Sequence, residues 1–199
     1  MPADVSHQKR ALRAELRERR RNLTSTERAA ATAGFTARLI ELTESVGAKS
    51  ISAYLSASDE PDTRPFLHWA IEHDIRTLLP ISRVDGLLDW SLADKDTEEQ
   101  IDDFGMPAPV GKVLSPMAIN DVDLIIVPAA SVDERGVRLG WGRGYFDKTL
   151  GSMEGCPPVY AVVFDSELLA EVPRERHDQP VDGAVTPTRT VRFPSLRRG

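Results

Sequence analysis

The chain has 199 residues, a formal net charge of −6 and a pI near 5.3, with 41% hydrophobic and 28% charged residues. These values favour one globular domain over residues 1–199, and the acidic balance argues against general nucleic-acid binding. The longest apolar runs, at 124–127 and 160–164, are far too short to span a bilayer. We therefore predict a protein that binds neither nucleic acid nor membrane.

Cysteine and histidine usage limits the compartment and the metal chemistry. Cys156 is the only cysteine, so no intrachain disulfide is possible, and residues 1–10 contain no apolar core typical of a secretory signal. The four histidines have no zinc-ligand spacing. We predict a cytoplasmic protein, and we interpret Cys156, which two prolines follow, as a bystander thiol rather than a nucleophile.

An N-terminal helical segment is predicted over residues 7–46. Residues 7–22 are rich in helix formers, and Thr24 or Ser25 followed by Glu27 predicts the start of a second helix that ends before Gly47. We expect residues 35, 39, 40 and 42 to form the buried face of this second helix.

One stripe of the first helix combines apolar and cationic side chains. Leu12 and Leu16 indicate a face packed on the body of the protein, and Lys9 and Arg13 lie on or beside that face. A cation near an apolar contact needs a partner. Lys9 and Arg13 are therefore candidates to bind a ligand anion, with a solvated basic helix as the alternative.

The rest of the chain alternates strands and helices. We predict strands at 49–56, 75–81, 86–92, 123–129 and 158–164, and a helix at 64–73 that Asp62 or Thr63 caps. The continuous apolar run at 123–129 is typical of a central parallel strand. This alternation predicts an α/β fold with a mainly parallel open sheet flanked by helices.

Three segments are expected to lie outside this framework. The acidic residues 94–103 predict a solvated loop or short helix, and residues 104–110 predict a kinked, extended loop because of Pro107 and Pro109. Residues 189–199 form a basic tail with little to bury, so we expect disorder there unless it docks.

Residues 138–147 (RLGWGRGYFD) are the strongest candidate for a binding site. Gly140, Gly142 and Gly144 follow a predicted strand and precede a possible helix at 145–150, where open α/β sheets bind ligands. Glycines allow positive φ and close approach of an anion, and two arginines supply positive charge. The spacing matches neither a Walker loop nor a dinucleotide fingerprint, and a surface glycine turn remains the alternative.

A second candidate follows the first predicted strand. Asp59 and Glu60 lie just beyond its carboxyl end, where a ligand approaches such a sheet. A helix start is the alternative interpretation of this acidic loop.

Separated motifs in this chain resemble the 5-formyltetrahydrofolate cyclo-ligase family. They occur in that family's order between about residues 8 and 186: 9–13 (KRALR), 54–60, 105–107 (GMP), 127–128 (VP), 138–147 and 181–182 (VD). The Arg-Leu-Gly-x-Gly-x-Gly-Tyr-x-Asp segment is the most specific of them.

The resemblance implies a fold shared with sugar-phosphate isomerases and CoA transferases, and an ATP- and Mg²⁺-dependent reaction. That reaction closes 5-formyltetrahydrofolate to 5,10-methenyltetrahydrofolate and releases ADP and phosphate. In such enzymes the formyl oxygen attacks the γ-phosphate of ATP, which gives a phosphorylated imidate-like intermediate. Folate N10 then attacks the formyl carbon and phosphate leaves. This mechanism needs positioning and charge neutralisation more than a protein nucleophile.

The resemblance also implies residue roles. It assigns ATP binding to Lys9, Arg10, Arg13, Arg138, Leu139, Gly140, Trp141, Gly142, Arg143, Gly144, Tyr145 and Phe146. It assigns folate binding to Leu55, Glu60, Trp141, Gly142, Arg143, Gly144 and Tyr145. Arg143 and Tyr145 would be catalytic, and Asp147 and Asp182 would bind Mg²⁺.

Two departures from the family pattern bear on function. Phe146 stands where a second tyrosine is common, and residues 129–132 (AASV) replace a more usual Gly-rich, Phe-containing stretch. Neither change removes a charged group that the reaction requires. The alternatives are a non-catalytic folate- or nucleotide-binding paralogue and a sugar-phosphate isomerase or CoA transferase on a related fold. We expect a monomer with small-molecule substrates.

Overall fold

The computed structural model describes residues 4–194. The helices are α1 (Val5–Arg21), α2 (Ser25–Ser45), α3 (Arg64–Glu72) and α4 (Tyr145–Gly151), with 3₁₀ helices η1 (Pro116–Asp121) and η2 (Asp165–Glu167). The first strands are β1 (Ser50–Ser52), β2 (Arg76–Ser82), β3 (Leu88–Ala93), β4 (Glu98–Ile101), β5 (Pro107–Val110), β6 (Val113–Leu114) and β7 (Leu124–Pro128). The remaining strands are β8 (Ser131–Asp133), β9 (Arg138–Leu139), β10 (Val159–Val162), β11 (Leu168–Leu169), β12 (Gly183–Val185) and β13 (Thr190–Arg192).

The predicted α/β fold with a mainly parallel sheet is confirmed. Eight strands form one sheet in the order β13-β12-β10-β7-β1-β2-β3-β6. The central strands β12, β10, β7, β1 and β2 pair in parallel, and the strands nearer the two edges pair antiparallel. The carboxyl ends of the parallel strands therefore lie along one edge of the sheet.

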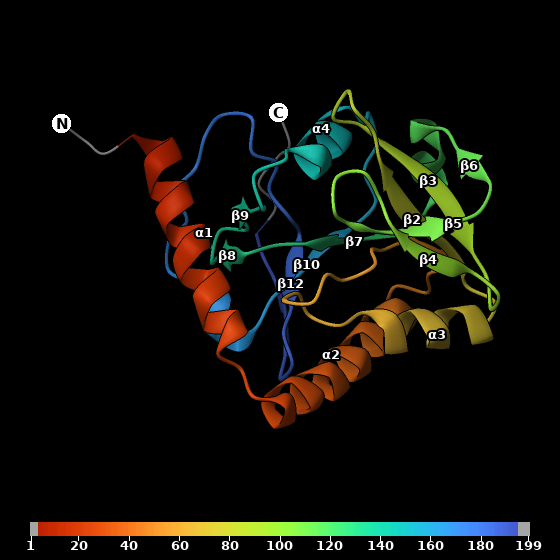
Figure 1. The fold of residues 1–199 in the computed structure, drawn as a ribbon, viewed down its shortest axis with the longest axis horizontal. Helices are drawn as coiled ribbons and strands as arrows, with labels where there is room; N and C mark the ends of the chain where they lie inside the picture. The colour runs from red at the N-terminus through yellow and green to blue at the C-terminus, as the bar shows by residue number, and fades with distance from the viewer. Residues whose placement is uncertain (1–3, 195–199) are drawn as a thin grey trace.

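Strand β7 shows why its sequence is continuously apolar. Leu124 and Ile126 belong to the core cluster formed with α2 and α3, whereas Ile125 and Val127 belong to the cluster formed with η1 and α4. All four side chains are fully buried. Because alternate residues of a strand point to opposite faces, β7 needs apolar residues at every position. Figure 1 shows the layers, with α2 and α3 over one face of the sheet and α4 over the other.

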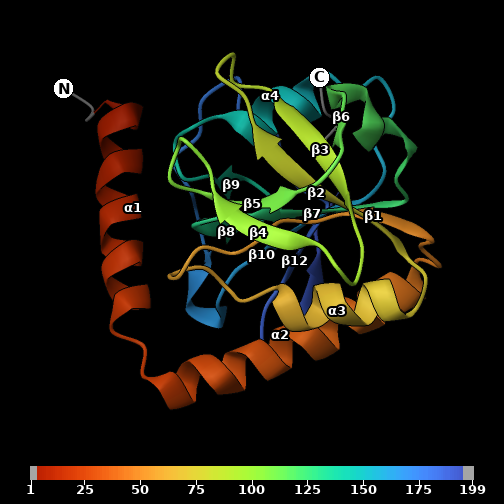
Figure 2. The same cartoon turned by 45° about the vertical axis from the view of Figure 1, so that its right-hand side comes forward.

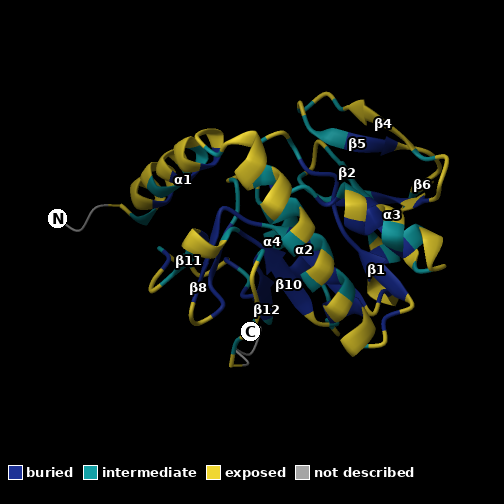
Figure 3. Cartoon of the chain, turned by 90° about the horizontal axis from the view of Figure 1, so that it is seen from below, coloured by how far each residue is buried: buried dark blue, intermediate teal, exposed yellow. Residues whose placement is uncertain are grey.

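Helix α1 lies beside these layers rather than over the sheet (Figure 2). Its Leu16 is fully buried in a third apolar cluster, with residues of the small sheet β11-β8-β9 and its surroundings. The outward faces of α1 and α2 are exposed, while strands β10 and β12, which pack against α2, are buried (Figure 3). The predicted amphipathic stripe of this helix is therefore confirmed.

A buried ion pair fixes the C-terminal half of α1. Arg20 donates from Nε and Nη2 to the two carboxylate oxygens of Glu167, at 2.7 and 2.8 Å, and from Nη2 to the Ala129 carbonyl at 2.7 Å. The Arg20 and Glu167 side chains are 1% and 2% exposed. Burial lowers the pKa of Arg20, but the hydrogen bonds and charge of Glu167 outweigh this effect and raise the pKa above its ordinary value.

Helix α2 begins and ends as predicted. The Glu27 amide donates to Thr24 Oγ1, and the Thr24 amide donates to the Glu27 carboxylate, which completes a capping box. Beyond the C-terminal end of the helix, Gly47 has a φ of +64°, a conformation that glycine adopts without strain. Of the expected buried face, Ile40 is only partly buried. Among residues 4–194, no helix combines the length and apolar character needed to cross a bilayer.

The acidic stretch is solvent-exposed as predicted, but residues 98–101 and 107–110 are strands that the sequence analysis did not predict. Instead of a solvated loop and a proline-kinked linker, β4 and β5 form an antiparallel hairpin. Asp102 stabilises its turn, because its carboxylate accepts hydrogen bonds from the amides of Phe104 and Met106. The Asp102 amide donates to the Met106 carbonyl, so by the alternation of an antiparallel pair the two prolines of β5 occupy positions at which no amide hydrogen is needed.

The first strand and the basic tail complete the comparison with the predicted elements. The first strand is shorter than predicted, because only Ser50–Ser52 pair with neighbours in the sheet and the chain then leaves it. In the basic tail, which was expected to be disordered unless it docks, Thr190–Arg192 do dock, as edge strand β13 against β12. Residues 195–199 of the tail lie outside the described part of the chain.

We predict that Arg20→Met lowers the free energy of unfolding by about 3–5 kcal/mol, because it leaves the Glu167 carboxylate buried without its cation. Urea unfolding followed by circular dichroism measures this change. Arg19→Met is the matched control, since Arg19 forms an exposed pair with Glu15 in the same helix and should change stability by less than about 1 kcal/mol. Equal stability of the two variants would contradict the prediction.

Candidate active site

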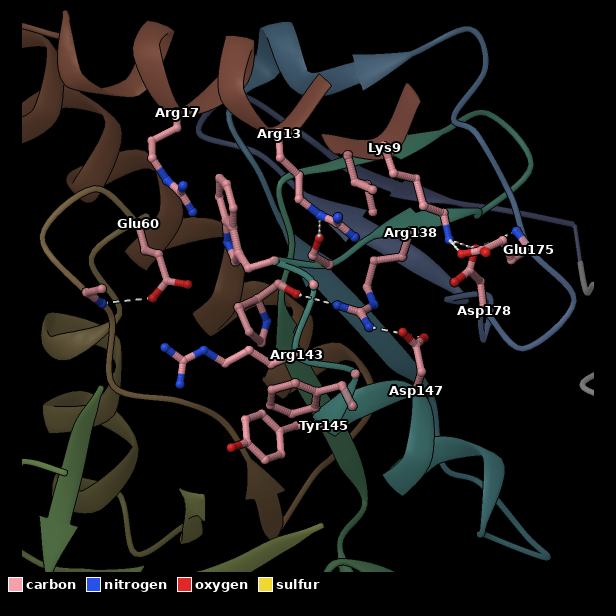
Figure 4. A pocket seen from close by; sticks show the side chains of 18 of the residues that line it. Lys9, Arg13, Arg17, Glu60, Arg138, Arg143, Tyr145, Asp147, Glu175 and Asp178 are labelled. Carbon is pink, nitrogen blue, oxygen red and sulfur yellow. Dashed lines mark hydrogen bonds and ion pairs between the residues drawn. The ribbon is translucent and has the colours of Figure 1, made fainter. Parts of the chain in front are cut away.

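A cleft of about 380 Å³ opens at the carboxyl edge of the parallel strands. Segments far apart in the sequence line it: Ser6, Lys9, Arg13 and Arg17 of α1; Ala57, Asp59 and Glu60 beyond β1; Met106; Pro128 at the end of β7; residues 138–147; and Glu175, His177 and Asp178. The two strongest sequence candidates, the basic stripe and the Gly/Arg segment, therefore face each other across one cavity (Figure 4).

The wall of the cleft that α1 forms is positively charged because three basic residues share one face of the helix. Lys9, Arg13 and Arg17 are four residues apart, so their side chains project from one face of the helix. Arg17 continues the stripe on which Lys9 and Arg13 were predicted, and this spacing could have identified it from the sequence.

The Lys9 ammonium is buried in the cleft wall. Its Nζ donates to Glu175 Oε2 at 2.7 Å and to Asp178 Oδ2 at 2.5 Å, and the Lys9 side chain is only 5% exposed. The solvated alternative for this residue is therefore wrong. Neither carboxylate was identified from the sequence, because residues 173–180 have no local pattern that points to a site.

Arg13 joins α1 to the glycine-rich segment. Its Nε donates to the Gly140 carbonyl at 2.7 Å. Burial lowers the pKa of Arg13, while the nearby charges of Asp178 and Glu175 oppose this shift. Arg13 thus lies between the glycine-rich loop and the two carboxylates that pair with Lys9.

The glycine-rich loop follows β9 and leads into α4. Gly142 and Gly144 have φ angles of +98° and +74°, which other L-residues rarely adopt. Between them, Arg143 extends to the β4–β5 turn and donates from Nη2 to the Phe104 carbonyl at 2.8 Å. The loop conformation therefore requires glycine at two of the three predicted positions, and it directs Arg143 along the cleft.

Arg138 and Asp147 form the floor beside this loop. The Arg138 guanidinium donates to the Pro128 carbonyl at 2.9 Å and to Asp147 Oδ1 at 3.2 Å. The Gln179 amide donates to the same Asp147 oxygen at 3.0 Å. The Arg138 side chain is only 3% exposed. Its two hydrogen bonds connect Pro128, at the end of β7, to Asp147 of α4.

Glu60 lies at the opposite end of the cleft. It is 7% exposed, and its Oε2 accepts a hydrogen bond from the Ala57 amide at 2.8 Å. Burial raises the pKa of Glu60 above its ordinary value, and the Ala57 hydrogen bond opposes the shift only in part. The acidic loop beyond β1 thus supplies a buried carboxyl group to the cleft as predicted, in addition to preceding α3.

Aromatic side chains line part of the cleft. The guanidinium groups of Arg17 and Arg20 lie 4.9 and 5.0 Å from the Trp141 ring centroid, within the range of cation–π attraction. Tyr145 packs edge-to-face against Phe104, with ring centroids 6.4 Å apart. Tyr145 and Phe146 both line the cavity and contact the core cluster beneath it.

Three residues that were assigned to the site lie elsewhere. Arg10 is exposed and does not line the cleft, because one residue of helix rotates it away from Lys9. Leu55 is buried in the core cluster formed with α2 and α3 rather than exposed to the cavity. Asp182 directly precedes β12, so it lies at the amino edge of the sheet, opposite the cleft, where it accepts a hydrogen bond from the Val159 amide.

The oxygen donors of the cleft fit a hard divalent cation. Asp147 lines the cavity, and ligand atoms of Glu175, His177 and Asp178 lie within 4.8 Å of one another. Carboxylates are the protein ligands that Mg²⁺ prefers. Of the two aspartates predicted to bind metal, Asp147 lines the cavity, whereas Asp182 lies at the amino edge of the sheet, so Asp147 is the better-placed candidate.

These features define a class of protein. A cavity that combines several cations with buried carboxyl groups, at the carboxyl edge of a parallel sheet, is typical of α/β enzymes with anionic substrates. Comparison with known proteins identifies the particular family.

The chain belongs to the 5-formyltetrahydrofolate cyclo-ligase family, whose model matches residues 5–187. It is 34% identical over 151 residues to the 5-formyltetrahydrofolate cyclo-ligase of Mycolicibacterium smegmatis, covering 73% of this chain and 77% of that protein. It is 26% identical over 180 residues to the enzyme of the same name from Haemophilus influenzae, covering 88% and 96%. The NMR structure of Aquifex aeolicus 5,10-methenyltetrahydrofolate synthetase superposes with a TM-score of 0.78 at 27% identity, covering 95% and 94% of the two chains.

These comparisons confirm the resemblance seen in the separated motifs, and they confirm that the chain is an enzyme of the ligase type. They favour the cyclo-ligase family over the isomerase and transferase alternatives.

The raised pKa of Glu60 predicts a pH-dependent stability difference. The folded state binds the Glu60 proton more tightly than the unfolded state does. Protonation of Glu60 therefore stabilises the wild-type fold at a pH below the ordinary carboxyl pKa, and this stabilisation is lost as the pH rises through the pKa of the folded state. Glu60→Gln stays neutral throughout. Its free energy of unfolding relative to wild type should therefore be more favourable at about pH 7.5 than at about pH 4. Urea titrations at the two pH values measure the difference, and a difference that is constant or moves the other way contradicts the prediction.

Proposed function

We propose that this enzyme catalyses the ATP- and Mg²⁺-dependent closure of 5-formyltetrahydrofolate to 5,10-methenyltetrahydrofolate, with release of ADP and phosphate. The observation that carries the proposal is the convergence of Lys9, Arg13 and the 138–147 loop around one cavity in a chain of this family. The formyl oxygen attacks the γ-phosphorus and ADP leaves. Folate N10 then attacks the formyl carbon and loses its proton to solvent, and the bond between the formyl carbon and the phosphorylated oxygen breaks to release phosphate.

In this proposal the protein neutralises and orients the phosphates. Phosphoryl transfer spreads negative charge over the transferring group, so cations fixed near it lower the barrier. Lys9 and Arg13 contribute from α1, and Arg143 contributes from the glycine loop between two residues of positive φ. Arg138 has a supporting role, because its guanidinium already contacts Pro128 and Asp147.

The folate would occupy the end of the cleft near Glu60. A carboxyl group matches the amino and ring-nitrogen donors on the edge of a pterin. Trp141 and Tyr145 line the same cavity as Glu60, and their rings suit the flat heterocycle and the aminobenzoyl group. Their position supports the prediction that Arg143 and Tyr145 act where folate and phosphate meet.

Magnesium fits the carboxylates on the Asp147 side of the cavity. Bound there, the ion would neutralise phosphate charge, while Asp147 orients both Arg138 and the Gln179 backbone. Asp182 has no place in this proposal because it lies at the amino edge of the sheet.

We further propose that the enzyme works as a one-domain monomer in the cytoplasm. One chain supplies every wall of the cleft, and a single cysteine suits a reducing compartment. The non-catalytic alternative depends on Phe146, which lacks a hydroxyl group but still lines the cavity.

The reaction itself is the first prediction to test. Purified protein mixed with 5-formyltetrahydrofolate, ATP and Mg²⁺ should show the rising near-ultraviolet absorbance of the methenyl product, and omission of ATP should abolish the rise. A flat trace from folded protein, with a known cyclo-ligase active in the same buffer, would favour the non-catalytic alternative.

We expect Arg143→Ala to lower kcat/KM for ATP by about 10²-fold, since it removes a cation beside the transferring phosphoryl group. Steady-state kinetics with varied ATP and saturating folate provide the measurement. Arg135→Ala is the control, because Arg135 is exposed and pairs with Glu171 outside the cleft. ATP kinetics of Arg143→Ala that match those of this control would contradict the role of Arg143.

A further inference from the structure

We propose that Arg64 and Glu99 form a positioning pair, which holds the β4–β5 hairpin at the cleft so that the turn of the hairpin orients Arg143. The effect of the pair on catalysis rests on the function proposed above, in which Arg143 acts on the transferring phosphoryl group. Neither member of the pair belongs to the sequence motifs or to the residue roles that the family resemblance implies.

Arg64, the first residue of α3, joins two segments through one guanidinium group. It donates from Nε and Nη2 to the two carboxylate oxygens of Glu99 in β4, at 2.9 and 2.8 Å. Its Nη1 donates to the carbonyl and the hydroxyl oxygen of Ser56, at 3.0 and 2.9 Å. Because a two-bond contact between arginine and a carboxylate fixes direction as well as distance, it sets β4 relative to the loop that precedes α3.

The β4 side of the hairpin has little else to hold it. All four residues of β4 are exposed, and within residues 4–194 the contacts with Arg64 are the only side-chain hydrogen bonds of this strand. In β5, Ala108 and Pro109 are buried, but Pro107 lines a second cavity of about 440 Å³, which residues 56–62 also line. The hairpin is therefore anchored through β5, and the position of β4 depends on the ion pair rather than on apolar packing.

The turn of the hairpin carries this position to the active site. Phe104, three residues after β4, accepts a hydrogen bond from Arg143 Nη2 through its carbonyl at 2.8 Å. Within residues 4–194 this is the only hydrogen bond of the Arg143 side chain, which belongs to an exposed residue. A change in the tilt of β4 would thus remove the contact that orients Arg143. An arginine that is oriented before phosphate binds has less ordering to undergo during binding.

The pair should affect position much more than stability. The Arg64 and Glu99 side chains are 33% and 38% exposed, so water screens their attraction. Partly exposed ion pairs contribute little to the free energy of unfolding, although two-bond geometry places this pair among the stronger ones. A variant that lacks the pair is therefore expected to fold normally and to lose activity.

Two adjacent glutamates of β4 provide a matched test. Glu99→Gln leaves at most one hydrogen bond to Arg64 and removes the charge, so we expect kcat/KM for ATP to fall about fivefold. The urea midpoint of unfolding should stay at the wild-type value. Glu98→Gln is the control, because Glu98 is exposed and points to the opposite face of the strand. Equal ATP kinetics of the two variants would overturn the proposal.

A second substitution shows whether the pair acts through Arg143. If it does, the variant Arg143→Ala/Glu99→Gln has the same kcat/KM for ATP as Arg143→Ala alone. A further fivefold loss in the double variant would overturn the proposal, because the pair would then act on another part of the site.

Cleavage by chymotrypsin reports the position of the hairpin without any ligand. Phe104 is half-buried and packs against Tyr145, so cleavage after Phe104 requires local opening of the turn. Mass spectrometry should show faster cleavage at this site in Glu99→Gln than in wild type, whereas Glu98→Gln should match wild type.

This measurement separates the proposal from the proposed function. Equal cleavage of the three proteins would overturn the positioning role even if the enzyme closes 5-formyltetrahydrofolate as proposed. Wild-type protein without activity, together with faster cleavage of Glu99→Gln, would overturn the proposed function and support the positioning of the hairpin.

Discussion

The buried ion pair between Arg20 and Glu167 is the interaction on which the cleft depends. Removing two charges from water costs several kcal/mol per ion, and only a well-aligned pair with further hydrogen bonds offsets that cost. The bidentate contact, the Ala129 carbonyl and the Trp141 and Phe164 rings beside the guanidinium supply such contacts for one orientation of α1, although Arg20 Nη1 has no hydrogen-bond partner within residues 4–194. Lys9 is eleven residues before Arg20, about three helical turns away, so fixing Arg20 directs Lys9, Arg13 and Arg17 towards the sheet.

The cations of the cleft are placed by the protein before any ligand binds. Lys9 pairs with Glu175 and Asp178, Arg13 contacts Gly140, and Arg143 contacts Phe104. A polar site whose groups are already oriented stabilises developing charge without reorganisation, which is the main electrostatic advantage of an enzyme over water. The cost is that each cation must be partly neutralised in the free protein, and this explains why carboxylates line a cleft proposed to bind phosphate.

The β4–β5 hairpin shows how a peripheral element contributes to the site. Its turn places Phe104 against Tyr145 and offers a backbone carbonyl to Arg143, and Met106 lines the cavity. The hairpin pairs only within itself. The position of the hairpin at the cleft therefore depends on side-chain and loop contacts rather than on backbone hydrogen bonds to the main sheet.

Local sequence determined the main helices, the central buried strand and two parts of the site, namely the basic stripe of α1 and the glycine-rich loop. Apolar periodicity defined α1, α2 and the buried strand β7, and the glycine spacing defined the loop in which Gly142 and Gly144 have positive φ. These features arise from the backbone preferences and burial of neighbouring residues, so they can be recognised in a short window.

Only the tertiary structure decided which side chains meet. It paired β4 with β5 across an Asp102 turn, placed Leu55 in the core and Asp182 at the amino edge of the sheet, and brought Glu175 and Asp178 to Lys9 across more than 160 residues of sequence. Strand order and register, rather than any local pattern, bring such distant residues together. Nothing in a short stretch of sequence reports them, because the ends of parallel strands become neighbours only when the sheet is assembled.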